Sequence, residues 1–306
     1  GLGDVYKRQF PDDPEFDGMP KNAEDRRFMA MPAYLGGRYQ MAGMKWYGSN
    51  IENHKKGLPR SILMLTLNDK DTGAPVAYMS ANILSAYRTG AVPGVGFKYF
   101  AREDADTVGI IGPGVMGKTA FAAAMAVRPS IKKVKIKGSS LKSKSAAEFA
   151  EFVKESYPSV KEIRIVGTDE EAVRDSDIVS IATSSPTGDI SQYPYIKEEW
   201  IKPGAVLSCP AAARFDDDFL IHRARNVADN IMLYEAWEDE MPYPAYESIP
   251  IPAVHCMDLI HDGKMTKDQV DDLGDVITGK VPVHRRKDEI VVYSCLLYTS
   301  DAADDR

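Results

Sequence analysis

A glycine-rich segment, Gly112-Pro-Gly-Val-Met-Gly117, has the spacing of a turn that binds the phosphates of a dinucleotide. It follows an apolar run at 106–111, which we predict as a strand, and precedes an alanine-rich run at 118–127, which we predict as a helix. The first glycine permits the tight turn, the second lets backbone approach a pyrophosphate, and the third allows close packing. The alternative is an ordinary glycine-rich turn. We predict a nicotinamide dinucleotide site that includes Gly112, Gly114, Val115, Met116 and Gly117.

The end of the next predicted strand decides between the two nicotinamide cofactors. An NAD site usually has an Asp or Glu there, which accepts the ribose hydroxyls. Here the strand ends in Ile136-Lys-Gly-Ser-Ser140 and continues as Leu-Lys-Ser-Lys144, without an acid. The hydroxyls of Ser139 and Ser140, together with Lys142 and Lys144, have the chemistry to bind a 2′-phosphate. We therefore favour NADP(H) over NAD(H), with a solvated basic loop as the alternative.

The composition limits the other ligand classes. The 306 residues carry a formal net charge of -7, which argues against a nucleic-acid partner. The histidines have no metal-ligand spacing, and we expect no metal. No apolar run approaches the length of a membrane span, and no charged-then-apolar segment resembling a signal peptide stands at the start of the given sequence. The three cysteines are widely spaced and predict neither disulfides nor zinc. We expect a cytoplasmic protein with small-molecule ligands.

The predicted elements divide the chain into two kinds of structure. Two strand-like runs at 61–67 and 74–79 flank a turn cluster at 68–73 and predict a hairpin in an antiparallel or mixed sheet. From residue 106 to residue 208 short strands alternate with helices, which predicts a parallel, doubly wound sheet of the α/β class. Between them, 84–102 reads as a helix in which Pro93 marks a break or a start.

Both ends of the chain look foreign to the rest. Residues 1–9 and 295–306 resemble translated sequencing-adapter text, and we expect them to be non-native. We therefore exclude both ends from the fold prediction.

Several motifs in order resemble the ornithine cyclodeaminase/μ-crystallin family. The resemblance extends over residues 25–294 and includes the glycine motif. Its other parts are Tyr87-Arg-Thr-Gly-Ala91, Ser176-Asp-Ile-Val-Ser-Ile-Ala-Thr-Ser-Ser185, Trp200-Ile-Lys-Pro-Gly204, Thr278-Gly-Lys280 and Asp288-Glu-Ile-Val-Val292. The resemblance implies a homodimer and a Rossmann domain inserted into a smaller α+β substrate and dimerisation domain. We accordingly expect substrate-domain structure at 10–99, the Rossmann domain at 100–283, and a return to the substrate domain at 284–294.

The resemblance also implies the substrate site. Arg88 matches an arginine that binds the substrate carboxylate, for which its guanidinium is well suited, although a local helix contact is the simpler interpretation. Lys45 matches a lysine that binds substrate or transfers a proton; the simpler interpretation is a solvated strand lysine. Met31 matches a residue of the substrate pocket. A second carboxylate-binding arginine is not placed, with Arg26 and Arg27 as candidates.

Further positions match the cofactor site. Thr89 follows the substrate arginine, and Ala182, Thr183 and Ser184 end a predicted strand. Ligands in open α/β sheets bind at the carboxyl ends of strands, so these residues are expected near the nicotinamide.

One departure from the family bears on the reaction. Cyclodeaminases have an aspartate after the strand at 206, and here that segment reads Ser208-Cys-Pro-Ala-Ala-Ala-Arg-Phe-Asp-Asp-Asp218, with no acid at 211–213. We expect an NAD(P)-dependent oxidoreductase that acts on the C–N bond of an amino acid, imino acid or N-carboxyalkyl amino acid. The alternatives are an ornithine cyclodeaminase, or a non-catalytic NADPH-dependent binding protein like μ-crystallin.

Overall fold

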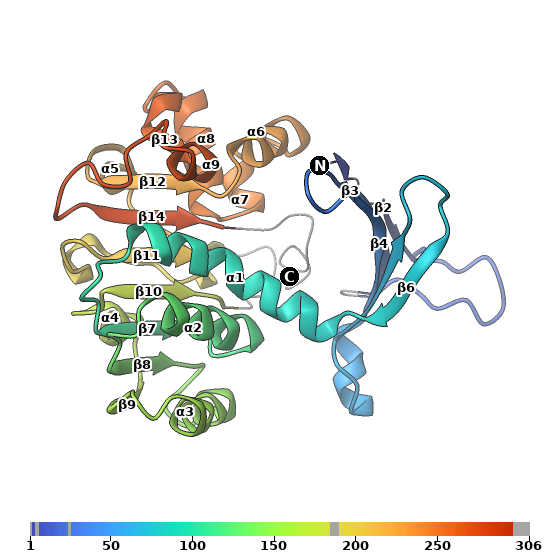
Figure 1. Cartoon of the computed structure of the whole chain (residues 1–306), viewed down its shortest axis with the longest axis horizontal. Helices are drawn as coiled ribbons and strands as arrows, with labels where there is room; N and C mark the ends of the chain where they lie inside the picture. Colours follow the sequence, from blue (N-terminus) through green and yellow to red (C-terminus); the bar gives the residue numbers. More distant parts are fainter. Residues whose placement is uncertain (1, 4–5, 24–25, 184–189, 296–306) are drawn as a thin grey trace. The chain divides into compact units, whose positions relative to one another are not determined.

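The computed structural model describes residues 2–3, 6–23, 26–183 and 190–295, which form two compact units (Figure 1). The first unit precedes Arg88 and the second begins there. Within the described residues, no helix combines the length and the apolar character that a membrane span requires.

An antiparallel sheet makes up most of the first unit. Its main strands lie in the sequential order β3 (Arg27–Leu35), β4 (Met41–Ser49), β5 (Ser61–Asn68) and β6 (Pro75–Ser80). The predicted hairpin at 61–79 is confirmed, because β5 and β6 pair directly. The short strands β1 (Leu2–Gly3) and β2 (Tyr6–Gln9) also pair with β3, so residues that we had excluded from the fold take part in this sheet.

The two faces of this sheet differ because side chains alternate along each strand. On one face Met29, Tyr47 and Leu63 lie on neighbouring strands and form a small buried core. The opposite face carries Phe28 and Trp46, which are 41% and 43% exposed. The 3-10 helix η1 (Ile51–Lys56) connects β4 to β5.

The second unit contains an eight-stranded parallel sheet in the order β13-β12-β14-β11-β10-β7-β8-β9 (Figure 1). The predicted α/β class, with a doubly wound parallel sheet, is confirmed. The strands are β7 (Thr107–Ile111), β8 (Lys133–Lys137), β9 (Glu162–Val166), β10 (Ile178–Ile181), β11 (Val206–Cys209), β12 (Ala224–Ala228), β13 (Val270–Asp272) and β14 (Ile290–Ser294).

Helices cover this sheet on both faces. Phe121 of α2 (Val115–Val127) and Phe149 of α3 (Lys144–Ser156) share one core with Ile110 and Ile136 of the sheet. Gly109 alternates with Ile110 and faces α4 (Asp169–Val173), which therefore packs on the other side. The remaining helices are α1 (Asn82–Phe100), α5 (Asp217–His222), α6 (Ile231–Glu240), α7 (Ala245–Ser248), α8 (Pro252–His261), α9 (Leu273–Ile277), η2 (Ile190–Gln192), η3 (Glu198–Trp200) and η4 (Lys267–Gln269).

Helix α1 differs from its prediction at two points. Pro93 lies inside the helix and neither breaks nor starts it. The second unit begins at Arg88 within this helix rather than at residue 100. From this point on, glycines let α1 approach α2 closely. A Cβ added at Gly90 would lie 2.4 Å from Thr119 of α2, and one added at Gly94 would lie 2.6 Å from Ala123 of α2. This part of α1 therefore packs directly on α2.

The prediction that 284–294 returns to the substrate domain is wrong. Strand β14 pairs in parallel with β11 on one side and with β12 on the other, in the interior of the large sheet. Its residues Val291, Val292 and Tyr293 are almost completely buried. A continuous apolar run of this kind is typical of a central parallel strand, whose two faces are both covered.

Candidate cofactor and substrate site

The glycine turn between β7 and α2 has the backbone geometry that its sequence predicts. Gly112 has a φ of 95°, and an added Cβ would lie 2.4 Å from the carbonyl oxygen of Ala182. A Cβ at Gly117 would lie 2.4 Å from the carbonyl oxygen of Gly112. At Gly114, which caps α2, an added Cβ would meet nothing within 4 Å. The first and third glycines thus permit close packing, whereas the second leaves open space before the helix N-terminus.

A cleft of about 530 Å³ lies along this turn. It is lined by Gly112, Pro113, Lys137, Gly138, Ser139, Asp169, Thr183, Ser191, Gln192, Tyr193, Pro194, Tyr195 and Arg214. The free N–H groups and positive dipole of a helix N-terminus favour phosphate here. The open space at Gly114 and the lining of the cleft therefore fit a dinucleotide.

The end of β10 supplies one further polar atom to the cleft. Thr183 lines it, and the Thr183 Oγ1 is buried with no hydrogen-bond partner in the described part of the chain. Ala182 is buried beside Gly112. A buried hydroxyl without a partner has a free energy cost that a ligand can remove. Ser184, also expected here, lies outside the described residues.

Only part of the expected phosphate-binding loop reaches the cleft. Ser139 lines it, but Ser140, Lys142 and Lys144 are not among the lining residues. The Lys144 side chain is 91% exposed and lies 3.6 Å from Glu148. These residues follow the end of β8 on the surface.

Sequence reasoning missed three charged residues that line the same cleft. Lys137 and Asp169 form an ion pair with an Nζ–Oδ1 distance of 3.2 Å. Arg214 donates from Nε to the carbonyl oxygen of Tyr193 at 3.1 Å, and its guanidinium lies 5.3 Å from the centre of the Tyr195 ring. No motif marks these positions, because they meet only through the sheet and its loops.

In the first unit, Lys45 and Met31 lie directly opposite each other on β4 and β3. Leu65 flanks Lys45 on β5, and the Lys45 ammonium lies 5.6 Å from the centre of the Tyr47 ring. Met31 is buried, and Lys45 is partly buried on the same face. The two residues predicted to contact substrate are therefore neighbours within one sheet.

The structure also distinguishes Arg26 from Arg27, the two candidates for a second carboxylate-binding arginine. Arg27 is the first residue of β3, is only 5% exposed, and alternates onto the same face as Met29 and Met31. Arg26 precedes the strand and donates to the Lys21 carbonyl oxygen at 2.7 Å. Arg27 is thus the arginine that shares a sheet face with Lys45.

Arg88 lies in α1, at the start of the second unit. Its side chain is partly buried, and the next residue, Thr89, is 6% exposed. Both residues lie on the part of the helix that leads into the packed contact with α2.

The segment after β11 carries alanine at 211–213, where cyclodeaminases have an aspartate nearby. Asp216 instead accepts a hydrogen bond from the Tyr195 hydroxyl at 2.5 Å, and Asp217 lies 2.9 Å from His255. Both carboxylates are therefore engaged at the start of α5, where acids also suit the helix dipole.

One carboxyl group at the carboxyl edge of the large sheet has unusual electrostatics. Asp229 follows β12, and burial raises the pKa of its carboxyl group to about 7. Hydrogen bonds from the Tyr234 hydroxyl at 2.8 Å and from the Asn230 backbone N–H at 3.0 Å lower this pKa and so partly offset the effect of burial. This group therefore changes its charge close to neutral pH. Within the described residues, no cluster of His, Cys, Asp and Glu has the arrangement of a metal site.

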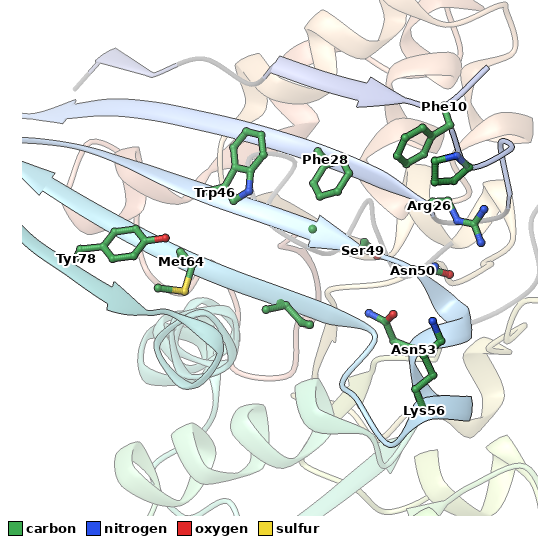
Figure 2. Close-up of a pocket in the computed structure, with 13 residues that line it drawn as sticks. Phe10, Arg26, Phe28, Trp46, Ser49, Asn50, Asn53, Lys56, Met64 and Tyr78 are labelled. Carbon is green, nitrogen blue, oxygen red and sulfur yellow. The ribbon is translucent and has the colours of Figure 1, made fainter. Parts of the chain in front are cut away.

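A second cavity, of about 680 Å³, lies over the exposed face of the antiparallel sheet (Figure 2). Phe28 stacks on Trp46 with ring centres 5.8 Å apart, and Phe10 meets Phe28 edge-on at 6.1 Å. Tyr78 lies farther along the same face, and Arg26 lies at the end near Phe10. The wall of this cavity is mainly aromatic and apolar.

Comparison with known proteins identifies the relatives of this chain. The model of the ornithine cyclodeaminase/mu-crystallin family matches residues 2–301. The chain is 27% identical over 270 residues to N-((2S)-2-amino-2-carboxyethyl)-L-glutamate dehydrogenase of Staphylococcus aureus, covering 87% of this chain and 73% of that protein. It is 31% identical over 207 residues to alanine dehydrogenase of Archaeoglobus fulgidus, covering 66% of this chain and 59% of that protein.

A solved structure has a similar fold. The Δ1-pyrroline-2-carboxylate reductase of Thermococcus litoralis, in complex with NADH and L-proline, superposes with a TM-score of 0.70 at 26% identity. The match covers 91% of this chain and 80% of that one. Both the small antiparallel sheet and the parallel sheet thus belong to a known arrangement.

Proposed function

The chain belongs to the ornithine cyclodeaminase/μ-crystallin family, and from that premise we propose that it is an NAD(P)-dependent oxidoreductase acting on a C–N bond. The substrate class is an amino acid, an imino acid or an N-carboxyalkyl amino acid. The observation that carries the proposal is the open glycine turn at Gly114 beside a cleft with a buried, unbonded Thr183 hydroxyl. The named activities of the relatives, two dehydrogenases and an imine reductase, support it.

The cofactor is proposed to be a nicotinamide dinucleotide, with NADP(H) favoured. Gly112, Gly114 and Gly117 shape the turn proposed to receive the phosphates, and Ser139, which lines the cleft, is proposed to lie near the adenosine ribose. The second strand of the sheet ends without an acid, which favours a 2′-phosphate over a bare ribose. When bound, the nicotinamide supplies or accepts the hydride of the reaction.

Lys45 is proposed to hold and deliver a proton at the reacting nitrogen. Its ammonium lies over the Tyr47 ring and opposite Met31, so its position is fixed by neighbours on the sheet. An imine becomes a better electrophile when its nitrogen is protonated, and a positioned ammonium can supply that proton.

The substrate carboxylate is proposed to bind Arg88, and Arg27 is the second candidate. A guanidinium forms two parallel hydrogen bonds with a carboxylate, which fixes orientation as well as position. Arg27 is favoured over Arg26 because it is buried on the face of β3 that also carries Met31.

Two alternatives have distinguishable chemistry. An ornithine cyclodeaminase would release ammonia from ornithine without net oxidation of the cofactor; the absence of an acid at 211–213 argues against it. A non-catalytic binding protein would bind NADPH and show no turnover. The same fold serves both, so only the reaction itself distinguishes them.

The test is a turnover screen with the full chain. Pyruvate with ammonia, cyclic imino acids, and pairs of an amino acid with a 2-oxo acid are each supplied with NADH or NADPH, and nicotinamide absorbance is followed. The proposal predicts consumption of reduced cofactor with at least one substrate class. Ammonia release from ornithine with no net redox change would instead identify a cyclodeaminase.

The chain is further proposed to form a homodimer through the exposed face of its antiparallel sheet. In the described part of the first unit, Phe28, Trp46 and Ile62 are each more than 40% exposed, although the Phe10 ring contacts Phe28 edge-on. An apolar sheet face is stable when another layer covers it. A second copy offers the same face through a two-fold axis, and a two-fold interface needs only one self-complementary patch.

A further inference from the structure

An ion pair lies in the cleft beside the glycine turn. Lys137 is the last residue of β8, and Asp169 is the first residue of α4, which follows β9. Their charged atoms lie 3.2 Å apart, and the two side chains are only 23% and 22% exposed. Both line the cleft together with Gly112 and Ser139.

Lys137 lies at the end of the second strand of the sheet, where Rossmann proteins commonly distinguish NAD from NADP. Lys137 pairs with Ile111, the residue before the glycine turn, and on its other side with Val166 of β9. In a Rossmann sheet the end of this second strand faces the adenosine ribose, and an acid there selects NAD. Here the last strand residue is a cation, and the nearby carboxylate comes from the helix after the third strand.

The other lysines of this region are less suitable. Lys142 is exposed and does not line the cleft. Lys144 is 91% exposed and already lies 3.6 Å from Glu148. A cation that is partly shielded from water interacts more strongly with an anion than a fully exposed one.

We propose that Lys137 is the cation that binds the 2′-phosphate of NADP(H), and that Asp169 is a positioning residue that sets the strength of this preference. This inference rests on the proposed cofactor function. The Asp169 carboxylate holds the ammonium at the cleft when no phosphate is present. It also repels the added negative charge of a 2′-phosphate, so the pair permits both cofactors and limits the discrimination between them.

The test measures binding of the adenosine half of the cofactor, independently of turnover. The full chain is titrated calorimetrically with 2′-phospho-ADP-ribose and with ADP-ribose. In Lys137→Gln the affinity for 2′-phospho-ADP-ribose falls about 10-fold or more, and the affinity for ADP-ribose is unchanged. In Asp169→Asn the affinity for 2′-phospho-ADP-ribose rises about 3-fold, because a repulsive charge is removed.

Two controls make the result specific. Lys154→Gln removes the same charge from the exposed surface of α3, at a residue that does not line the cleft, and should leave both affinities unchanged. Lys137→Arg should keep the preference for the phosphorylated ligand, because the charge is retained. Added salt should weaken the binding of 2′-phospho-ADP-ribose more than that of ADP-ribose, both in the parent protein and in Lys137→Arg, because the 2′-phosphate adds charge to that of the pyrophosphate.

The outcomes separate this inference from the proposed function. If ADP-ribose binds and Lys142→Gln, rather than Lys137→Gln, loses the phosphate preference, the inference is wrong and the cofactor site remains. If Lys137→Gln binds both ligands as the parent protein does, the inference is also wrong. If neither ligand binds the parent protein, the proposed function fails as well.

Discussion

The Lys45 ammonium has an aromatic ring 5.6 Å away and apolar neighbours, Met31 and Leu65, on the two adjacent strands. A lysine on a freely solvated strand would not have this surrounding. The chemical role proposed for Lys45 therefore rests on a position that the sheet fixes, and not on its residue type alone.

Replacing Lys45 by Met should lower kcat about 100-fold or more, because proton delivery to the substrate nitrogen is lost while the shape of the side chain is kept. Cofactor binding should be unchanged, since the glycine turn lies in the other unit. Steady-state kinetics with the substrate found in the screen measures the first effect, and fluorescence titration with NADPH measures the second. Lys70→Met, in the turn between β5 and β6, is the matched control, and unchanged kcat in Lys45→Met would refute the role.

The ionisation of the Asp229 carboxyl group makes the free energy of unfolding depend on pH. Because its pKa is raised to about 7 in the folded protein, from 3.8, the folded state loses stability as the pH rises through this interval and the buried carboxyl group ionises. Asn keeps an acceptor for the Tyr234 hydroxyl and cannot ionise. We expect Asp229→Asn to gain roughly 1–2 kcal/mol over the parent protein at about pH 8, and little at about pH 4. Urea unfolding at both pH values measures this; a gain that is the same at both would contradict it.

At the scale of elements, the glycine turn was predictable because each glycine has a local steric reason. Gly112 requires a positive φ, and Gly117 requires contact with a backbone carbonyl group. Such requirements act within a few residues of the chain, so the sequence displays them.

Substitutions at two of the glycines, Gly112 and Gly114, should have two different effects. Gly112→Ala should destabilise the fold, because its Cβ would meet backbone at 2.4 Å and its φ is 95°. Gly114→Ala should fold as the parent protein does, since its Cβ meets nothing within 4 Å, but should bind the dinucleotide about 10-fold more weakly or worse. Thermal unfolding and NADPH titration of both variants separate the effects. Unaltered binding in Gly114→Ala would show that the turn does not receive the phosphates.

Other features depend on contacts between distant segments, and the sequence did not reveal them. Lys137 and Asp169 are far apart in the chain and meet because β8 and β9 are neighbours. Strand β14 was assigned to the substrate domain because the family resemblance implied a returning C-terminal segment, whereas it pairs with β11 and β12 in the large sheet. Pro93 was predicted to mark a helix break or start, although it lies inside the continuous helix α1. The sequence therefore indicated the local steric requirements of the glycine turn, but it indicated neither the strand order nor the Lys137–Asp169 ion pair.

At the scale of the whole molecule, the antiparallel sheet leaves aromatic side chains exposed on one face (Figure 2). Phe28 and Trp46 stack there, and Met64 and Tyr78 continue the apolar surface. A contiguous exposed patch of several large apolar side chains usually marks an interaction site.

Trp46→Glu should convert the proposed homodimer into a monomer, because it places a charge at the centre of the apolar face. Trp46 is 43% exposed, so the substitution should leave the fold of the subunit intact. Ile277→Glu, at a residue 46% exposed in the second unit, is the matched control and should remain dimeric. Sedimentation velocity at several concentrations measures the state; a parent protein that is monomeric throughout would contradict the proposal.

The central claim, hydride transfer at a C–N bond, is tested most directly by isotope transfer. The full chain is incubated with an imino acid, or with a 2-oxo acid and an amine, and with NADPH or NADH that carries deuterium at both hydrogen positions of the nicotinamide C4. Mass spectrometry then locates the label. We expect one deuterium on the carbon of the new C–N bond, and formation of this product about 100-fold more slowly, or slower still, with Lys45→Met. Formation of the product without the label would contradict the account.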